Sequence, residues 1–83
     1  MTYSVRFTDT AEKQLKKLEK KTQGRILAVL ERIRIRPYSF VEKLTGYPFY
    51  RMKAGDYRII MDIRNDELLI LVVEVGHRRN IYK

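Results

Sequence analysis

The spacing of apolar residues changes along this chain, and that change restricts its fold more than any other feature. Between Ala11 and Ile33 the apolar side chains recur every three or four positions, as on one face of a helix. From Phe49 onward the pattern changes to that of strands, first with apolar and polar side chains in alternation and then with a nearly continuous apolar run. A chain of 83 residues has room for one domain, residues 1–83, so both halves must share one small core.

The first half predicts a short strand followed by a helical hairpin. Tyr3–Phe7 alternates apolar and polar side chains and is the strand. Asp9 with Glu12 three positions later is a helix-start signal of the capping-box type, and Thr22 can cap a second helix. Pro37 ends that helix, because the residue before a proline disfavours helical conformation. The apolar positions of the two helices are Ala11, Leu15, Leu18, Ile26, Val29, Leu30 and Ile33.

The second half predicts an antiparallel meander of three strands, because only short turns separate its apolar runs. Gly76 is expected to end the last strand, and the amino-terminal strand is expected to join the same sheet at an edge or in the centre. The predicted fold class is α+β: a small curved antiparallel β-sheet with an αα-hairpin packed on one face. The three meander strands are Phe49–Lys53, Asp56–Arg64 and Glu67–Val75, the last apolar enough to be central.

Composition excludes several kinds of site. The chain has no cysteine, which rules out disulfide scaffolds, thiolate zinc sites and cysteine nucleophiles. A single histidine cannot form a His-rich metal site or a two-histidine ribonuclease site. We therefore expect no metal and no cofactor. No apolar run reaches the ~18–20 residues of a membrane span, and the amino terminus does not resemble a secretory signal, so we expect a cytoplasmic protein without a membrane partner.

Positive charge is in excess, with 18 Lys and Arg against 10 Asp and Glu and a net charge of +8. Such a balance favours a polyanionic partner, either nucleic acid or an acidic protein. One basic region lies on the predicted helical hairpin, where lysines could hold RNA through phosphate contacts or simply form a solvated surface. The residues assigned to RNA or ribosome binding are Lys13, Lys16, Lys17, Lys20 and Lys21, with Arg79 near the carboxyl end.

A second basic region lies on the predicted strands. Arg51 and Lys53 are two residues apart, so their side chains project from the same face. Arg58 is out of phase with its apolar neighbours, and a turn of about two residues should bring it near Lys53 across the strand pair. Like charges that face each other destabilise a sheet, so this cluster favours an external anion. The alternative is an ordinary solvated face.

The segment after the last strand carries further candidates. Turning at Gly76 would put His77, Arg78 and Arg79 on a loop at the end of the sheet, and loops held by a rigid scaffold often carry function. A solvated basic tail is the alternative, and a lone histidine is more often structural than catalytic. Tyr82 could fill the core or stack on a base.

Two motifs lie at a fixed separation in the strand half. Tyr50–Arg58 reads YRMKAGDYR, Val75–Arg78 reads VGHR, and Ile81-Tyr82 follows. The chain resembles the RelE toxins of the RelE/ParE superfamily over its whole length. The resemblance rests on these motifs, on Lys43-Leu44 before them and on the order of the predicted elements. The resemblance implies the toxin of a type II toxin–antitoxin system. It also implies an antitoxin partner with an acidic surface that wraps around the toxin.

The same resemblance implies an activity. RelE toxins enter the A site of the ribosome and cut the mRNA codon there without a metal: the ribose 2′-hydroxyl attacks the adjacent phosphate, leaving a 2′,3′-cyclic phosphate and a 5′-hydroxyl. The implied function is therefore a ribosome-dependent endoribonuclease, an mRNA interferase that inhibits translation. A face with several cations and no paired carboxylates suits a pentacovalent phosphorane, with proton transfer left to Lys, Arg, Tyr or His.

Strand residues of the motif take family roles by resemblance. Lys53 matches the lysine proposed as general base, which can accept a proton where neighbouring cations disfavour its charged form. Arg58 matches the arginine that clamps the scissile phosphate. Arg51 stands where well-studied members have a second lysine, so its implied role is charge rather than proton transfer.

Tail residues take the remaining roles. Arg78 matches the arginine that stabilises the transition state or assists the leaving oxygen. His77 occupies a position often taken by lysine, and in some relatives a nearby histidine is the acid or base. Tyr82 matches the tyrosine that orients or stacks a codon base.

Two other functions stay open on the sequence. One is a ParE-type toxin, which inhibits DNA gyrase; that branch generally lacks the basic set, so Lys53, Arg58 and Arg78 together argue against it. The other is a relative that binds RNA without cutting it. Arg78→Ala separates the cases, because a nuclease should lose cleavage whereas a binder should lose only part of its affinity.

Overall fold

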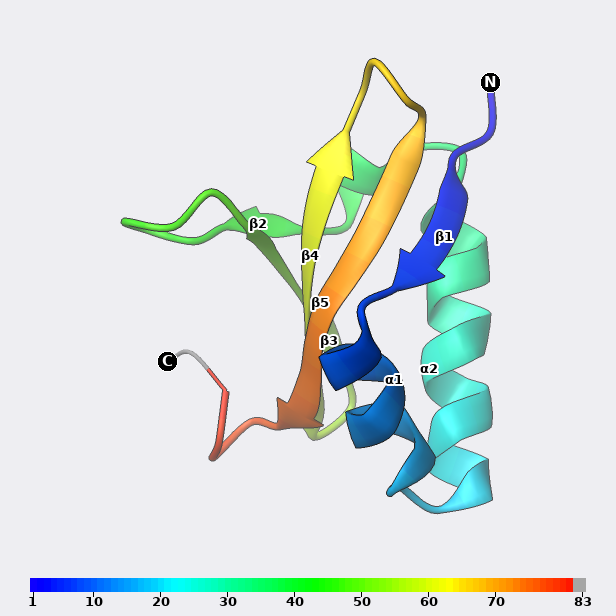
Figure 1. The fold of residues 1–83 in the computed structure, drawn as a ribbon, viewed down its shortest axis with the longest axis vertical. Helices are drawn as coiled ribbons and strands as arrows, with labels where there is room; N and C mark the ends of the chain where they lie inside the picture. Colours follow the sequence, from blue (N-terminus) through cyan, green and yellow to red (C-terminus); the bar gives the residue numbers. More distant parts are fainter. Residues whose placement is uncertain (82–83) are drawn as a thin grey trace.

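Two helices cover one face of a five-stranded sheet in the computed structural model, which describes residues 1–81 (Figure 1). This is the predicted α+β architecture, with the helical hairpin packed on one side. Within residues 1–81, neither helix has the length and apolar character needed to cross a membrane. The elements are β1 (Ser4–Phe7), α1 (Asp9–Lys16), α2 (Lys20–Ile33), a 3-10 helix (Pro37–Ser39), β2 (Glu42–Lys43), β3 (Tyr50–Ala54), β4 (Tyr57–Arg64) and β5 (Leu69–His77).

The strand order is β1-β5-β4-β3-β2. The meander β3-β4-β5 is as predicted, and β1 takes an edge position. The expectation of a wholly antiparallel sheet was wrong, because β1 pairs with β5 in parallel, Ser4 opposite Leu69. Parallel pairing needs a long connection between the strands, and the helices lie in that connection. The strand β2 was not predicted, because two residues are too few to show a period.

The predicted helix caps were wrong by one residue for α1 and by three residues for α2. Thr8 caps α1, its hydroxyl accepting a hydrogen bond from the Ala11 N–H at 3.1 Å, so Asp9 is already the first helical residue. α2 begins at Lys20, and Thr22 lies inside it. The link between the helices is tighter than the cap pattern implied. The Gln23 amide supports it by donating to the carbonyl oxygen of Leu18 at 2.8 Å.

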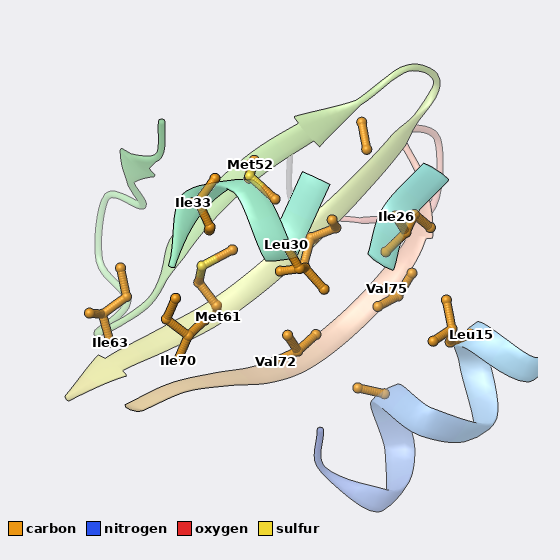
Figure 2. Packing of buried hydrophobic residues seen from close by; sticks show 13 residues of the cluster. Leu15, Ile26, Leu30, Ile33, Met52, Met61, Ile63, Ile70, Val72 and Val75 are labelled. Carbon is orange, nitrogen blue, oxygen red and sulfur yellow. The ribbon is translucent and has the colours of Figure 1, made fainter. Parts of the chain in front are cut away.

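The core lies between the helices and the sheet (Figure 2). An additional contact ties α1 to the centre of the sheet: the Gln14 side-chain oxygen accepts from the Val75 N–H at 2.7 Å. Because helices this short are marginal alone, this packing is what holds them in place. Side chains with almost no exposure on this side include Ile26, Leu30, Ile33, Ile59, Met61, Ile70 and Val72.

A β-bulge divides β5 into two halves of opposite phase. Met61 pairs with Val72 but Ile60 pairs with Glu74, which leaves Val73 as the extra residue. Val72 and Val75 therefore both face the helices, although they are three residues apart. The prediction that Gly76 ends the strand was wrong: Gly76 pairs with Arg58, and the strand continues to His77.

Candidate functional site

The sheet face away from the helices carries the predicted strand cations. Lys53 lies directly opposite Arg58, as predicted, and Arg58 lies opposite Gly76 on its other side. The Arg58 Nη1 donates to the carbonyl oxygens of Gly55 and Tyr57, both at 3.0 Å. These bonds hold the half-buried guanidinium at the β3–β4 turn, while Lys53 is exposed to solvent.

Arg51 shares this face but has a different environment. Glu42 lies directly opposite on β2, and its carboxylate approaches the Arg51 guanidinium at 3.7 Å. The Arg51 side chain is only 21% exposed. Its charge is thus partly neutralised, which fits the electrostatic role inferred from sequence better than contact with a mobile substrate.

Arg64, at the far end of the same face, is also neutralised. Its guanidinium lies 2.9 Å from Asp62 and 3.7 Å from Glu67. The hydrogen bond and the charge of Asp62 raise the pKa of Arg64 above its usual value. Arg64 is therefore committed to local ion pairs.

Lys53, Arg58 and Arg78 differ from these arginines, because none of them forms an ion pair within residues 1–81. The Arg78 N–H donates to the Asp56 carbonyl oxygen at 2.8 Å, so the strand pairing extends one step beyond β5. Because Asp56 is part of the β3–β4 turn, that bond places the Arg78 backbone beside this turn. Positive charge without a local counterion is therefore concentrated at this end of the sheet.

His77 does not join these cations. It lies opposite Tyr57, and the two rings meet edge to face with centroids 5.6 Å apart. Tyr57 packs against the helix-side core, so the imidazole lies on the opposite face from Lys53 and Arg58. Its Nδ1 accepts from the Arg79 N–H at 3.2 Å. The predicted loop position of His77 was wrong, since His77 is the last residue of β5. The other aromatic candidate of this segment, Tyr82, lies outside the described residues.

Two charged residues of the site were missed in the sequence. Arg25 of α2 reaches the β3–β4 turn, where its Nη1 lies 3.1 Å from the position that a Cβ on Gly55 would occupy. Only the tertiary packing of α2 on this turn reveals it. Glu74 lies opposite Ile60 on the cationic face, because the bulge reverses the phase of β5 there. The sequence signal for this was the break in apolar–polar alternation around Val73, which indicates a bulge.

Two carboxylates on this face, those of Glu42 and Glu74, stand apart from each other. Glu42 is on β2 and Glu74 on β5, with two strands between them. Glu42 is engaged with Arg51, and Glu74 forms no ion pair within the described part of the chain. These two carboxyl groups therefore do not form an acid–base pair.

The five lysines assigned to the helical hairpin gather around the α1–α2 link and are all exposed. Lys16 forms a 3.8 Å ion pair with Glu12. This link lies at the same end of the molecule as the β3–β4 turn and the end of β5, the lower end in Figure 1. The two basic regions of the sequence therefore meet at one end of the fold.

The candidate site is an open surface. Residues 1–81 enclose no pocket, and no cluster of three His, Asp or Glu side chains among them is placed to hold a metal ion. Such a surface can bind an extended polyanion, and its unpaired cations can stabilise negative charge that develops on a phosphate.

Known proteins resemble the chain in sequence and fold. A family model described as the ParE toxin of the type II toxin–antitoxin system, parDE, matches residues 5–82. The toxin RelG of Mycobacterium tuberculosis is 32% identical over 90 residues, covering 100% of this chain and 99% of the relative. A RelE-like toxin protein of Escherichia coli is 32% identical over 81 residues, covering 94% of this chain and 85% of the relative.

Solved structures agree on the fold. The toxin–antitoxin complex RelBE2 of Mycobacterium tuberculosis contains a chain that superposes with a TM-score of 0.87 at 23% identity, covering 94% of this chain and 100% of that one. The RelE–RelB complex of Pyrococcus horikoshii gives a TM-score of 0.80 at 28% identity, with coverage of 98% and 100%. Taken with the family model and the full-length relatives, this shows that the chain belongs to the RelE/ParE family of toxins of type II toxin–antitoxin systems.

Proposed function

We propose that this toxin is a metal-independent endoribonuclease that cuts mRNA in the A site of the ribosome and so inhibits translation. The observation that carries the proposal is the set of cations without acidic partners at one end of the sheet, Lys53, Arg58 and Arg78. On the same sheet face, Arg51 is paired with Glu42 and Arg64 with Asp62 and Glu67, whereas these three cations have no such pairing within residues 1–81. Three cations without an ion pair in the described part of the chain, at one end of the sheet, fit a site whose counterion is the substrate phosphate.

The proposed reaction uses only groups of the protein and the RNA, together with water. Lys53 takes the proton of the ribose 2′-hydroxyl, whose oxygen attacks the adjacent phosphorus. Arg58, held at the β3–β4 turn, binds the phosphate oxygens as negative charge builds on them. The bond from phosphorus to the 5′-oxygen breaks, and that oxygen takes a proton from water while the Lys53 ammonium returns one to water, which leaves a 5′-hydroxyl and a 2′,3′-cyclic phosphate. Arg78 stabilises the charge on the leaving oxygen.

The other assigned residues have supporting roles in this proposal. Arg51 supplies charge behind Lys53, and Tyr82 stacks on a codon base. We assign His77 a structural role rather than proton transfer, because its ring packs on Tyr57 and its Nδ1 is occupied by a backbone N–H.

Recognition of the ribosome is proposed to use the same end of the molecule. Lysines around the α1–α2 link, together with Arg79, would contact phosphates of ribosomal RNA and orient the cutting face without reading sequence. The second proposed partner is a cognate antitoxin with an acidic surface. Its binding would cover part of this positive end, and several of the similar solved chains are bound to a RelB antitoxin.

Primer extension on an mRNA in a reconstituted translation reaction tests the proposal. Wild-type toxin should give cuts in phase with codons that require ribosomes and persist with a chelator. Arg78→Ala should lose these cuts. Arg32→Ala is the matched control, since it removes another exposed arginine, on α2, and should cut normally. Absence of ribosome-dependent cuts by the wild type would reject the nuclease function.

Gyrase inhibition is the second candidate, because the matching family model is described by the ParE toxin. A supercoiling assay with purified gyrase separates the two. The nuclease proposal predicts no inhibition at toxin concentrations that stop translation. Inhibition that persists in Arg78→Ala would assign the chain to the gyrase-inhibiting branch, and activity in neither assay would favour a relative that only binds RNA.

A further inference from the structure

The chain turns back after β5 and packs on the sheet it has just left. Ile81 is only 5% exposed and belongs to a second apolar cluster, on the sheet face away from the helices. Its buried partners there are Leu44 and Ile60, with Phe49 and Val73 at the margin. A side chain four residues beyond the last strand is thus anchored beside the cationic site.

Gly76 provides the space in which Ile81 sits. A Cβ on Gly76 would lie 2.9 Å from both Cγ1 and Cδ1 of Ile81, closer than side-chain carbons approach one another. The backbone of Gly76 is not in the left-handed region, so its conformation does not require glycine. The close approach of Ile81 does. A glycine within a strand often marks such a contact.

The residues between Gly76 and Ile81 are held in a defined turn. The Arg78 N–H donates to the Asp56 carbonyl oxygen at 2.8 Å, and the Asn80 N–H donates to the His77 carbonyl oxygen at 2.8 Å. The His77 Nδ1 accepts from the Arg79 N–H at 3.2 Å. Arg78 is exposed yet lies between two fixed points, the strand pairing before it and the seat of Ile81 after it.

We propose that Ile81 is a positioning residue: seated over Gly76, it holds the turn that presents Arg78 at the end of the sheet beside Lys53 and Arg58. This inference rests on the proposed endonuclease function. An arginine on an unanchored terminal segment would have to lose backbone and rotamer freedom in each turnover. Anchoring the turn beforehand removes that requirement, and a small misplacement of a reacting group can cost about 10²-fold in rate.

The seat of Ile81 is the space over Gly76 beside Leu44 and Ile60. Measuring kcat and KM for cleavage of ribosome-bound mRNA in four variants tests its role. Ile81→Ala empties the seat, and Gly76→Ala displaces Ile81 without removing it. Both should lower kcat about 10- to 100-fold and leave KM nearly unchanged. Ile81→Val should keep most of the activity. Ile63→Ala is the matched control, because Ile63 is similarly buried at 8% exposure but lies at the far end of β4.

The double variant Gly76→Ala/Ile81→Ala provides a stricter test. In this proposal the methyl group added at position 76 lowers kcat because it displaces the Ile81 side chain. It should therefore lower kcat little further once Ile81 has been truncated to alanine. The double variant should therefore be no slower than the worse of the two single variants, whereas independent effects would multiply.

Amide hydrogen exchange at Arg78 reports the position of the turn without any cleavage. Exchange of this amide should be at least about tenfold faster in Ile81→Ala than in the wild type or Ile63→Ala, because the bond to Asp56 opens more often. Should the wild type cut no mRNA, the nuclease function fails while the exchange rates still decide whether Ile81 holds Arg78. Unchanged exchange in Ile81→Ala, or normal kcat in a cleaving protein, overturns the positioning role.

Discussion

Lys53 and Arg58 stand directly opposite each other on neighbouring strands, and neither has an ion-pair partner within residues 1–81. Like charges in this geometry destabilise a sheet, and favourable cross-strand pairs are worth roughly 0.2–1 kcal/mol. We therefore expect Lys53→Gln to leave the free energy of unfolding unchanged or to raise it by up to about 1 kcal/mol. The same substitution should abolish mRNA cleavage, since a glutamine cannot act as the base.

Urea denaturation beside the cleavage assay checks this prediction. Lys43→Gln is the control, because the Lys43 ammonium lies 5.1 Å from the centre of the Tyr50 ring and donates to the Tyr47 carbonyl oxygen at 3.1 Å. That variant should lose a little stability rather than gain any. A clear loss of stability in Lys53→Gln would contradict the prediction, because it would mean that the Lys53 amine makes a stabilising contact that outweighs its repulsion by Arg58.

Arg25 is the residue whose contribution only the folded chain reveals. Its guanidinium reaches the same turn that holds Arg58, so an RNA backbone that crosses this turn would meet both. Arg25→Ala should weaken binding to single-stranded RNA a few-fold and reduce the slope of log affinity against log salt by about 0.7, the value of one lost phosphate contact. Arg32→Ala, two helical turns further along α2, should change neither. Equal effects of both substitutions would indicate a diffuse charge effect.

At the scale of elements, sequence period predicted the helical hairpin, the three meander strands and the pairing of Lys53 with Arg58. Details that depend on one or two residues were not predictable in this way. Thr8 rather than Asp9 caps α1. The sequence could not distinguish them, because the two residues are adjacent and both threonine and aspartate are common at helix caps. The bulge at Val73 moves Glu74 onto the cationic face and His77 off it, so strict alternation beyond the bulge would assign both to the wrong face.

The caps give a prediction at this scale. Thr8→Ala should cost about 1 kcal/mol of stability, because the Ala11 N–H loses its acceptor at the start of α1. Thr22→Ala is the matched control: Thr22 lies inside α2, where alanine has the higher helix propensity, so stability should be unchanged or rise slightly. Thermal and urea unfolding of the two variants would decide between them. A larger loss in Thr22→Ala would restore the sequence-based assignment of the cap.

At the scale of the whole molecule, the fold brings the lysines of the α1–α2 link and the cations of the β3–β4 turn to one end, which we call the basic end. The α1–α2 link, the β3–β4 turn and the end of β5 come together there, whereas Asp62, Asp66 and Glu67 lie around the opposite turn (Figure 1). A protein with this charge distribution is attracted to a polyanion in the orientation that brings its candidate site to the polyanion first. Binding and cutting then depend on different residues of the same end, which makes them separable by mutation.

Two triple variants with the same net charge test that separation. Replacing Lys17, Lys20 and Lys21 by Gln should weaken binding to ribosomes and reduce the slope of log affinity against log salt by up to about 2–3, at 0.7–0.9 per phosphate contact. Replacing Arg6, Arg32 and Arg36 by Gln lowers the charge equally, from +8, at exposed positions away from the α1–α2 link and the β3–β4 turn. That control should keep nearly the wild-type slope, and both variants should keep kcat at saturating ribosome concentration. If the two slopes fell equally, net charge alone would govern association and the basic end would have no special role.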